Sequence, residues 1–493
     1  MKMARSISAL AVVGALACIA AGCGSDEKSS SSTAAAAPTT ATVAATTAVG
    51  SSGEPDTSIA PSSVVGTDVG GTDSTASADW SDTSATSDVS VETTETATGS
   101  SFGLEYTGGT AGTADSSLEA VTIGYVNQEG GTPAFPEATT GIDAAADYVN
   151  AELGGVQGHP LKVEKCIVQS EEDGQKCGTQ FANDDHVQLV VTGAMVVGNK
   201  SLYSVLAGKK PIIVSGPLTN DDFVTDGVYS FTPGSPGVLR GLAVFAAKNL
   251  PNTKRVAFLH STSAAGKAAL ELLFKPAMDK LGVEVTPVAV DPAATAPDVA
   301  AALQAAGADS ADAVVLTLGI QSCVAAYDAL SSLGVDKPVV TTGLCAGKQM
   351  TDHLKDIGVA GDFPDGWYFG SNGYSVFLPD EASGMQTFLD KVVQYGSPDV
   401  DFTGFASSSF PTLLTAVKLL NQLDLDSLTF DSVTSAIRSF TGPMMMVAGP
   451  MACGADPIFK SLCGTQMGVE QYLDGKWVAV ADGLTGTPID TAG

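Results

Sequence analysis

The sequence predicts an α/β fold of two lobes, each a doubly wound parallel sheet, joined by a hinge. From about Leu118 onward, short and almost continuously apolar segments alternate with amphipathic helical segments. This alternation is typical of parallel sheets that helices cover on both faces. The pattern runs once, is interrupted by the turn-rich residues 234–236, and then begins again. Two series of this length predict two lobes, each about the size of an ordinary domain.

The first 23 residues have the layout of an export signal. Lys2 and Arg5 precede an apolar stretch at 7–21, which is short for a membrane span. The stretch ends in Gly22-Cys23, and this ending resembles the lipobox of bacterial lipoproteins, in which the cysteine is lipidated and becomes the new N-terminus. We therefore expect residues 1–23 to be a lipoprotein signal peptide and Cys23 to anchor the chain in a lipid bilayer. The alternative is an ordinary cleaved signal with an incidental cysteine.

Residues 24–117 are predicted to be a disordered, acidic linker rich in Ser, Thr and Ala. The segment has few large apolar side chains, so it cannot offset the entropy lost on ordering. About a dozen acidic residues against the single Lys28 contribute to a net charge of −30, which argues against a nucleic-acid partner. No later apolar run approaches the ~18 residues of a transmembrane helix. We expect a flexible tether that holds a folded domain away from the membrane.

The cysteines of the folded part predict disulfides. Cys18 and Cys23 belong to the export signal, and the six others are grouped two by two. In an exported chain, closure between nearest neighbours is favoured, with free buried thiols as the alternative. A zinc site is not expected, because no C-x-x-C spacing occurs and the four histidines are scattered. The predicted pairs are Cys166–Cys177, Cys323–Cys345 and Cys453–Cys463.

The first series of elements starts with a β-branched strand at 120–126. A helix follows in which Ile142, Val149 and other apolar residues recur at steps of three and four, until Gly154 and Gly155 end it. The elements expected next are a strand at 161–166, a helix near 175–183, a strand at 189–192, a helix near 200–207 and a strand at 211–215.

The second series is expected to build the second lobe. Its elements are a helix at 238–249, a strand at 256–260, a helix at 264–281, a strand at 283–290, a helix at 297–306, a strand at 313–318, a helix at 324–333 and a strand at 339–342. The predicted two-lobed solute-binding domain spans 118–493, with the first lobe mainly 118–235, the second mainly 236–365, and the remainder shared. Right-handed crossovers place the loops at the carboxyl ends of the strands on one side of each sheet, so a cleft between the lobes is the expected ligand site.

Several short motifs, taken in their order, carry a family resemblance over about Leu118 to the C-terminus. The motifs are Ile123-Gly124-Tyr125, Gly141-Ile142-Asp143-Ala144-Ala145, Tyr148-Val149-Asn150, the run 154–161, Pro211 to Ser215 followed by Thr219, Gly266, and Asp474-Gly475-Lys476-Trp477. Together they resemble the branched-chain amino acid (leucine/isoleucine/valine) binding proteins, which are substrate-binding lipoproteins of ABC transporters with the type I periplasmic-binding fold.

The resemblance also implies a ligand site. In that family, hydroxyl and backbone groups of two first-lobe loops hold the ligand's carboxylate, and Thr219 and Pro217 match a hydroxyl and a backbone-carbonyl position. Val197 or Gly198 stands where the family has serine, so a backbone N–H would have to serve there. Cys345 lies in the loop where the family has its ammonium-binding acid. Since an ammonium in a dry cleft would lack its strongest partner, these departures argue against an ordinary α-amino acid ligand.

Further ligand-binding candidates follow predicted strands or begin a helix. Ser215 ends a strand, and its position agrees with the family register. For each candidate the alternative is a side chain that hydrogen-bonds within its own loop. The other candidates are Asn127, Gln128, Thr262, Ser263 and Ser408.

The function predicted from these features is binding without catalysis. The motifs of serine hydrolases, dinucleotide and phosphate loops and zinc proteases are missing, so we expect no enzyme, no cofactor and no metal. We expect an extracytoplasmic, lipid-anchored monomer on the outer face of the cytoplasmic membrane. It would capture a small polar molecule, amino-acid-like or related, and deliver it to ABC permease subunits, a partner implied only by the resemblance. The alternative is a membrane-tethered ligand sensor or envelope scaffold with a retained binding fold.

Overall fold

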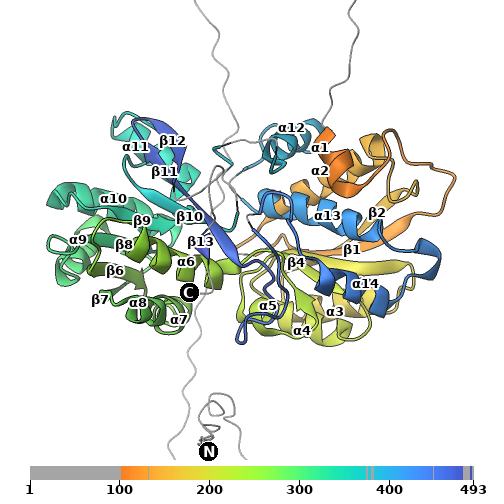
Figure 1. Cartoon of the computed structure of the whole chain (residues 1–493), viewed down its shortest axis with the longest axis horizontal. Coiled ribbons are helices and arrows are strands. Elements are labelled where there is room, and N and C mark those ends of the chain that lie inside the picture. The colour runs from red at the N-terminus through yellow and green to blue at the C-terminus, as the bar shows by residue number, and fades with distance from the viewer. Residues whose placement is uncertain are drawn as a thin grey trace, which may run out of the picture. The chain divides into compact units, whose positions relative to one another are not determined.

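The computed structural model describes residues 101–131, 133–373, 376–378, 382–402, 404–447, 449–480 and 489–490, which belong to one compact unit spanning Thr93–Gly493. The predicted signal peptide, Cys23 and most of the predicted linker lie outside the described residues. Within the described residues, no helix is long and apolar enough to cross a bilayer. Figure 1 shows two sheets, each with its own helices, and we call these halves the first lobe and the second lobe.

The first lobe is built on a parallel sheet with strand order β2-β1-β3-β4-β5. Side chains alternate across it: Ile123 and Tyr125 pack with helices α2 and α13, while Val126 packs with α3 and α4 on the other face. The strands are β1 Val121–Gln128, β2 Leu161–Val168, β3 Val187–Ala194, β4 Ile212–Gly216 and β5 Val228–Tyr229. The helices are α2 Pro136–Glu152, α3 Glu171–Ala182, α4 Asn199–Leu206, α5 Asn220–Val224, α12 Met385–Tyr395, α13 Ala406–Leu420 and α14 Phe430–Ser439, with a 3-10 turn at Leu425–Ser427.

The second lobe is built on a sheet with strand order β12-β11-β10-β9-β8-β6-β7. Leu259 and Leu316 face one apolar core, and Phe258 and Val315 face the other. The strands are β6 Arg255–Ser261, β7 Glu284–Val290, β8 Ala313–Thr317, β9 Val339–Thr342, β10 Tyr368–Ser371, β11 Gln466–Leu473, β12 Lys476–Ala479 and β13 Ile489–Asp490. The helices are α6 Gly234–Lys248, α7 Ala264–Ala268, α8 Lys275–Leu281, α9 Ala296–Ala305, α10 Ile320–Leu333 and α11 Lys348–Asp356, with a π-helical stretch at Ala269–Phe274 and a 3-10 turn at Gly343–Ala346.

The prediction of a two-lobed α/β fold is confirmed. In the second lobe, the sheet is not entirely parallel, because it has an antiparallel edge. Strands β6 to β10 are parallel, whereas β11 runs antiparallel to β10, β12 and β13. The β11–β12 hairpin turns at Asp474 and Gly475, both with positive φ (51° and 75°). Asp-Gly suits this two-residue turn, because its backbone twist matches the twist of the flanking strands. The motif noted in the sequence at 474–477 is thus the turn of an edge hairpin.

Segments that connect the two lobes lie against one another. The backbone N–H of Ser230, after β5, donates to the carbonyl of Ser461, and Cys463 donates back to Ser230, each at 2.8 Å. Met446 donates to the carbonyl of Ser383 at 2.9 Å, which joins the segment before α12 to the segment after α14. After β10 the chain therefore returns to the first lobe for α12 to α14 and then rejoins the second sheet at β11.

Helix α1, Ser101–Thr107, differs from the predicted linker, which was expected to run to residue 117. The hydroxyl of Tyr106 lies 2.8 Å from the Thr415 hydroxyl of α13 and accepts the N–H of Met445 at 2.9 Å. Burial raises the pKa of Tyr106 to about 12. Phe102 and Leu104 also pack against the first-lobe core. The folded part therefore includes Ser101–Thr107, because three large side chains of this short segment pack into the first-lobe core.

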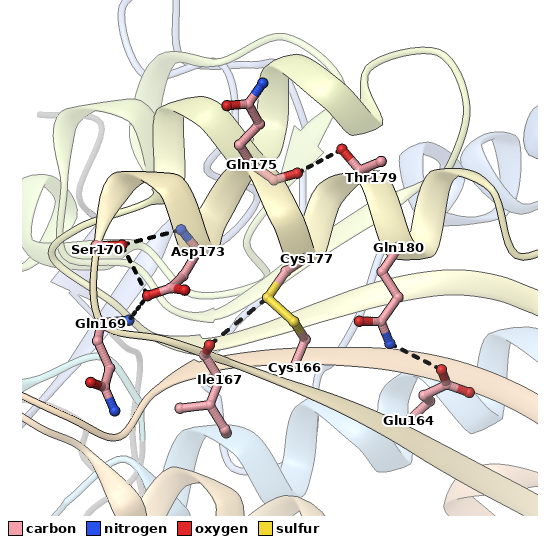
Figure 2. The surroundings of a disulfide bond; sticks show 10 residues. All are labelled: Glu164, Cys166, Ile167, Gln169, Ser170, Asp173, Gln175, Cys177, Thr179 and Gln180. Atoms are coloured by element: carbon pink, nitrogen blue, oxygen red, sulfur yellow. Dashed lines mark hydrogen bonds between the residues drawn. A yellow bond between two sulfur atoms is a disulfide. The ribbon is translucent and has the colours of Figure 1, made fainter.

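The three predicted disulfides are confirmed as Cys166–Cys177, Cys323–Cys345 and Cys453–Cys463. Figure 2 shows the first of them, which ties β2 to α3. Next to it Ser170 caps α3: its hydroxyl accepts the N–H of Asp173 at 3.2 Å and donates to the Asp173 carboxylate at 2.9 Å. The cap fixes the first turn of α3, and the disulfide ties its second turn to β2.

Candidate functional site

The loops that follow the carboxyl ends of the parallel strands contain most of the predicted ligand residues. We call these loops, with the helix ends beside them, the carboxyl edge of each lobe. In the first lobe they follow β1, β3 and β4, and in the second they follow β6, β8 and β9. In open α/β sheets this is the edge where ligands bind.

At the first-lobe edge, the side chain of Glu171, the first residue of α3, reaches the N-terminus of α4. Its carboxylate accepts the backbone N–H of Gly198 at 2.8 Å and that of Ser201 at 3.0 Å. Burial acts to raise the pKa of Glu171, but these N–H donors and the Ser201 hydroxyl outweigh it and lower the pKa below its ordinary value. The backbone N–H of Gly198 that was predicted for a ligand is thus already bonded to the protein's own carboxylate. Val197, the alternative at that position, is partly exposed.

The predicted hydroxyl at Thr219 is similarly engaged, by Asp222. Thr219 begins α5, and the Asp222 carboxylate accepts its N–H at 2.7 Å, its hydroxyl at 3.0 Å and the N–H of Leu218 at 2.9 Å. This reciprocal arrangement is a capping box. Asp222 is buried, and its carboxylate also accepts hydrogen bonds from the Asn199 amide and the Tyr203 phenol. The pKa of Tyr203 is raised, mainly by burial and in addition by the negative charge of Asp222. Pro217, the predicted carbonyl position, is buried beside this network.

Asn127 and Gln128 end strand β1 and hold neighbouring loops through their side chains. The Asn127 amide donates to the carbonyl of Phe135 at 2.8 Å and accepts the N–H of Ala194 at 3.1 Å. Gln128 donates to the carbonyl of Pro133 at 2.7 Å and accepts the N–H of Val196 at 2.9 Å. Both side chains are buried, so in this structure they support the edge, and contact with a ligand stays a prediction.

Ser215 lies inside the first lobe, close to the tip of α13. Its hydroxyl donates to the carbonyl of Thr192 at 2.8 Å and lies 3.1 Å from the hydroxyl of Ser409. Ser409 is fully buried, while Ser408, the predicted contact, is partly exposed on the first turn of the same helix. Burial raises the pKa of the nearby Tyr125, so its phenol stays neutral and can only exchange hydrogen bonds.

The second-lobe edge has fewer side-chain hydrogen bonds. Thr262 is exposed, whereas the Ser263 hydroxyl accepts the N–H of Gly266 at 3.1 Å and so caps α7. The Cys323–Cys345 disulfide joins the first turn of α10 to the 3-10 turn after β9. The hydroxyl of Thr342, the last residue of β9, is buried and has no hydrogen-bond partner among the described residues. Most buried polar groups in proteins are paired, so this hydroxyl is an exception at the second-lobe edge.

Two aromatic side chains at the first-lobe edge were missed in the sequence. Phe135 and Phe405 are both partly exposed, and their rings meet edge to face with centroids 5.1 Å apart. Phe405 lies against Gly216 at the end of β4, where an added Cβ would be 2.8 Å from its ring. The helical register of α13 could not reveal this, because Phe405 precedes the helix and reaches the edge only through tertiary packing.

A concave pocket in the second lobe lies at the opposite end of the sheet. It is lined where β9 and β10 begin, by Val339, Tyr368 and the end of α10, and contains none of the predicted ligand residues. A second pocket lies between α6 and the segment 452–465, beside the Arg240–Asp456 ion pair. Among the described residues, no group of three or more His, Cys, Asp or Glu could hold a metal ion.

The fold and its edges define a class of two-lobed α/β binding proteins, and the sequence places the chain in a family. The model of the periplasmic binding protein family matches residues 120–456. This chain therefore belongs to the periplasmic binding protein family. Comparison with curated proteins gave no match.

Solved structures with the same fold support this assignment. An ABC transporter substrate-binding protein from Sphaerobacter thermophilus matches with a TM-score of 0.59 and 17% identity, over 73% of this chain and 96% of that one. The branched-chain amino acid transporter substrate-binding protein LivJ from Streptococcus pneumoniae, in complex with isoleucine, matches with 0.55 and 17%, over 73% and 98%. A solute-binding protein from R. palustris in complex with 4-hydroxybenzoate matches with 0.55 and 16%, over 73% and 96%. The resemblance to branched-chain amino acid binding proteins is thus confirmed for the fold.

Proposed function

We propose that this chain is a non-catalytic solute-binding protein that captures a small molecule between its two lobes and delivers it to the permease of an ABC transporter. The observation that carries the proposal is the family match across both lobes, residues 120–456. The structures with this fold include ABC transporter proteins described with isoleucine and with 4-hydroxybenzoate. The connecting segments at Ser230, Ser383 and Met446 would serve as the hinge on which the lobes close.

A binding role also agrees with the chemistry of the carboxyl edges. The carboxylates of Glu171 and Asp222 cap helices, and the hydroxyl of Ser215 is held by a backbone carbonyl. An activated nucleophile would instead need a base within hydrogen-bond reach. These groups stabilise loops and shape a surface, which is what a binding protein requires of its site.

In this proposal, the export signal at residues 1–23 places the protein outside the cytoplasm. Cleavage before Cys23 and lipidation of that cysteine would anchor a monomer to the outer face of the cytoplasmic membrane, with the Ser/Thr-rich segment as a spacer. A Cys23→Ala variant should then be released from membranes into the soluble or culture fraction. Membrane retention of this variant, with Cys18→Ala as the matched control, would count against the anchor.

Uptake of an identified ligand tests the function. The full chain is screened by thermal shift against amino acids, amides, short-chain acids and polyols, since saturation at 100-fold the Kd adds about 2.7 kcal/mol to the stability. Cells without the chain are then expected to lose accumulation of the solute that raises the melting temperature. Normal uptake of that solute would contradict a role in transport.

A further inference from the structure

Exposed aliphatic side chains gather in the loops at the carboxyl edges. Val196 and Leu218 are 44% and 38% exposed and lie two residues after β3 and β4. Ile320 and Leu344 are 38% and 55% exposed and lie just after β8 and β9. Large apolar side chains left in water at equivalent places in both lobes indicate a surface that is covered in the working state of the protein.

The aromatic pair extends this surface in the first lobe. The backbone N–H of Phe135 donates to the carbonyl of Gln128 at 2.8 Å, which fixes the ring beside the end of β1. Phe405 packs on Gly216 at the end of β4 and meets Phe135 edge to face. A third ring can join such a pair in the same edge-to-face or offset geometry, so the site favours a flat aromatic body.

The polar groups of the same loops are directed to the protein. Gly198 and Ser201 donate their N–H groups to Glu171, while Leu218 and Thr219 donate theirs to Asp222. A ligand carboxylate placed at α4 or α5 would find these donors engaged and would meet a fixed negative charge. The first-lobe edge therefore exposes aliphatic side chains beside two carboxylates that cap its helices.

We propose, on the basis of the function proposed above, that the ligand is an uncharged molecule with an aromatic body, such as an aromatic amide or alcohol, which contacts Phe135, Phe405, Val196 and Leu218. In the second lobe, Leu344 and Ile320, both exposed, contact its other face. An amino acid is disfavoured, because its carboxylate would lie beside the carboxylates of Glu171 and Asp222 at these helix ends.

Calorimetric titration of the full chain with benzamide, benzoate, L-phenylalanine and L-leucine tests the proposal. Benzamide is expected to bind about tenfold more tightly than benzoate or either amino acid, because like charges are repelled at the helix ends. A Phe405→Leu variant should lose about fivefold in affinity for benzamide. An Ile458→Ala variant, which shortens an exposed side chain far along the chain from these loops, should bind as the wild type does.

A Glu171→Gln variant separates the effect of charge from the effect of shape. Removing that negative charge should strengthen benzoate binding about threefold and leave benzamide binding unchanged. Equal affinity of wild type and variant for benzoate would contradict the role of Glu171. Thermal unfolding of each variant without ligand shows whether it is folded.

The remaining outcomes distinguish this inference from the proposed function. If L-leucine or L-phenylalanine binds more tightly than benzamide, the uncharged-ligand inference is overturned while solute binding stands. Loss of that binding in Asp221→Asn would then show that Asp221, on the first turn of α5, holds an ammonium. If none of the four compounds binds, the inference is overturned, and the wider thermal-shift screen with the uptake measurement decides the function separately.

Discussion

The two carboxyl edges are stabilised in different ways. In the first lobe, charged and amide side chains cap helices and join loops: Glu171 at α4, Asp222 at α5, and Asn127 between the ends of β1 and β3. In the second lobe, a disulfide joins the first turn of α10 to the 3-10 turn after β9, and the Thr342 hydroxyl has no hydrogen-bond partner in the part of the chain that the structure describes. The first-lobe edge is therefore held mainly by side-chain hydrogen bonds, whereas the second-lobe edge is held by a covalent bond.

Removing the Cys323–Cys345 disulfide should have the largest effect on this comparison. Its 22-residue separation predicts a loss of about 3 kcal/mol in the free energy of unfolding for the Cys323→Ser, Cys345→Ser double variant. Urea denaturation under non-reducing conditions measures the change. A loss near zero would show that side-chain packing, and not the covalent bond, stabilises the second-lobe edge.

An Asp222→Asn variant tests the hydrogen-bonded first-lobe edge. The carboxylate is buried and accepts hydrogen bonds from Leu218, Thr219 and Asn199, which one amide oxygen cannot replace. We expect a loss of about 2 kcal/mol in unfolding free energy. The neighbouring Asp221→Asn is the matched control and should stay within about 0.5 kcal/mol of the wild type. Equal effects of the two variants would contradict the capping role.

Helix α1 packs on the first lobe, and a substitution at Tyr106 tests how much this packing contributes to stability. Tyr106→Phe keeps the ring but removes the buried hydrogen bonds to Thr415 and Met445. The expected loss is about 1 kcal/mol, because the Met445 N–H is left without its acceptor. Tyr327→Phe in the second lobe, whose partly exposed side chain lines the pocket at the amino ends of β9 and β10, should be neutral. Unchanged urea midpoints for both variants would mean that α1 adds no stability.

The pH dependence of Glu171 should be the smallest effect. Because its folded-state pKa is lowered, the stabilisation is complete above the ordinary glutamate pKa of ~4.3 and is lost as the pH falls through the folded-state value. Glu171→Gln should thus be about 0.5 kcal/mol less stable than the wild type at pH 7, and this difference should shrink below about pH 4. Glu172→Gln is the control. A pH-independent difference for Glu171→Gln would exclude the charge as its cause.

The sequence predicted the sheets well because burial on both faces leaves a strong signal. Runs such as Val121 to Val126 and Ala313 to Leu316 are almost continuously apolar, and nearest-neighbour cysteines lie in local units that can pair. Helix α1 was missed because seven residues carry too weak a periodicity, and its stability depends on Thr415 and Met445 far along the chain. The local sequence pattern therefore predicts strands and helices with a clear apolar run or periodicity. It fails for an element whose stability depends on contacts with residues distant in the sequence.

The sequence predicted where the candidate site lies better than it predicted which side chains are exposed there. Polar residues at strand ends, such as Asn127 and Ser215, were expected to face a ligand, but their side chains bond backbone groups of the neighbouring strand β3. Aliphatic residues at strand ends, such as Val196 and Leu344, look like core in a sequence and are exposed in the structure. Which of the two kinds faces solvent depends on tertiary contacts that no local pattern records.

Ligand-induced stabilisation in variants of each edge tests the central claim that the two carboxyl edges form one binding site. With the solute identified by the screen at 100-fold its Kd, the wild type should gain about 2.7 kcal/mol. Leu218→Ser in the first lobe and Leu344→Ser in the second should each lose most of that gain, while Lys337→Ser, in the pocket at the amino ends of β9 and β10, should keep it. Full stabilisation of both edge variants, or its loss in Lys337→Ser alone, would contradict the account.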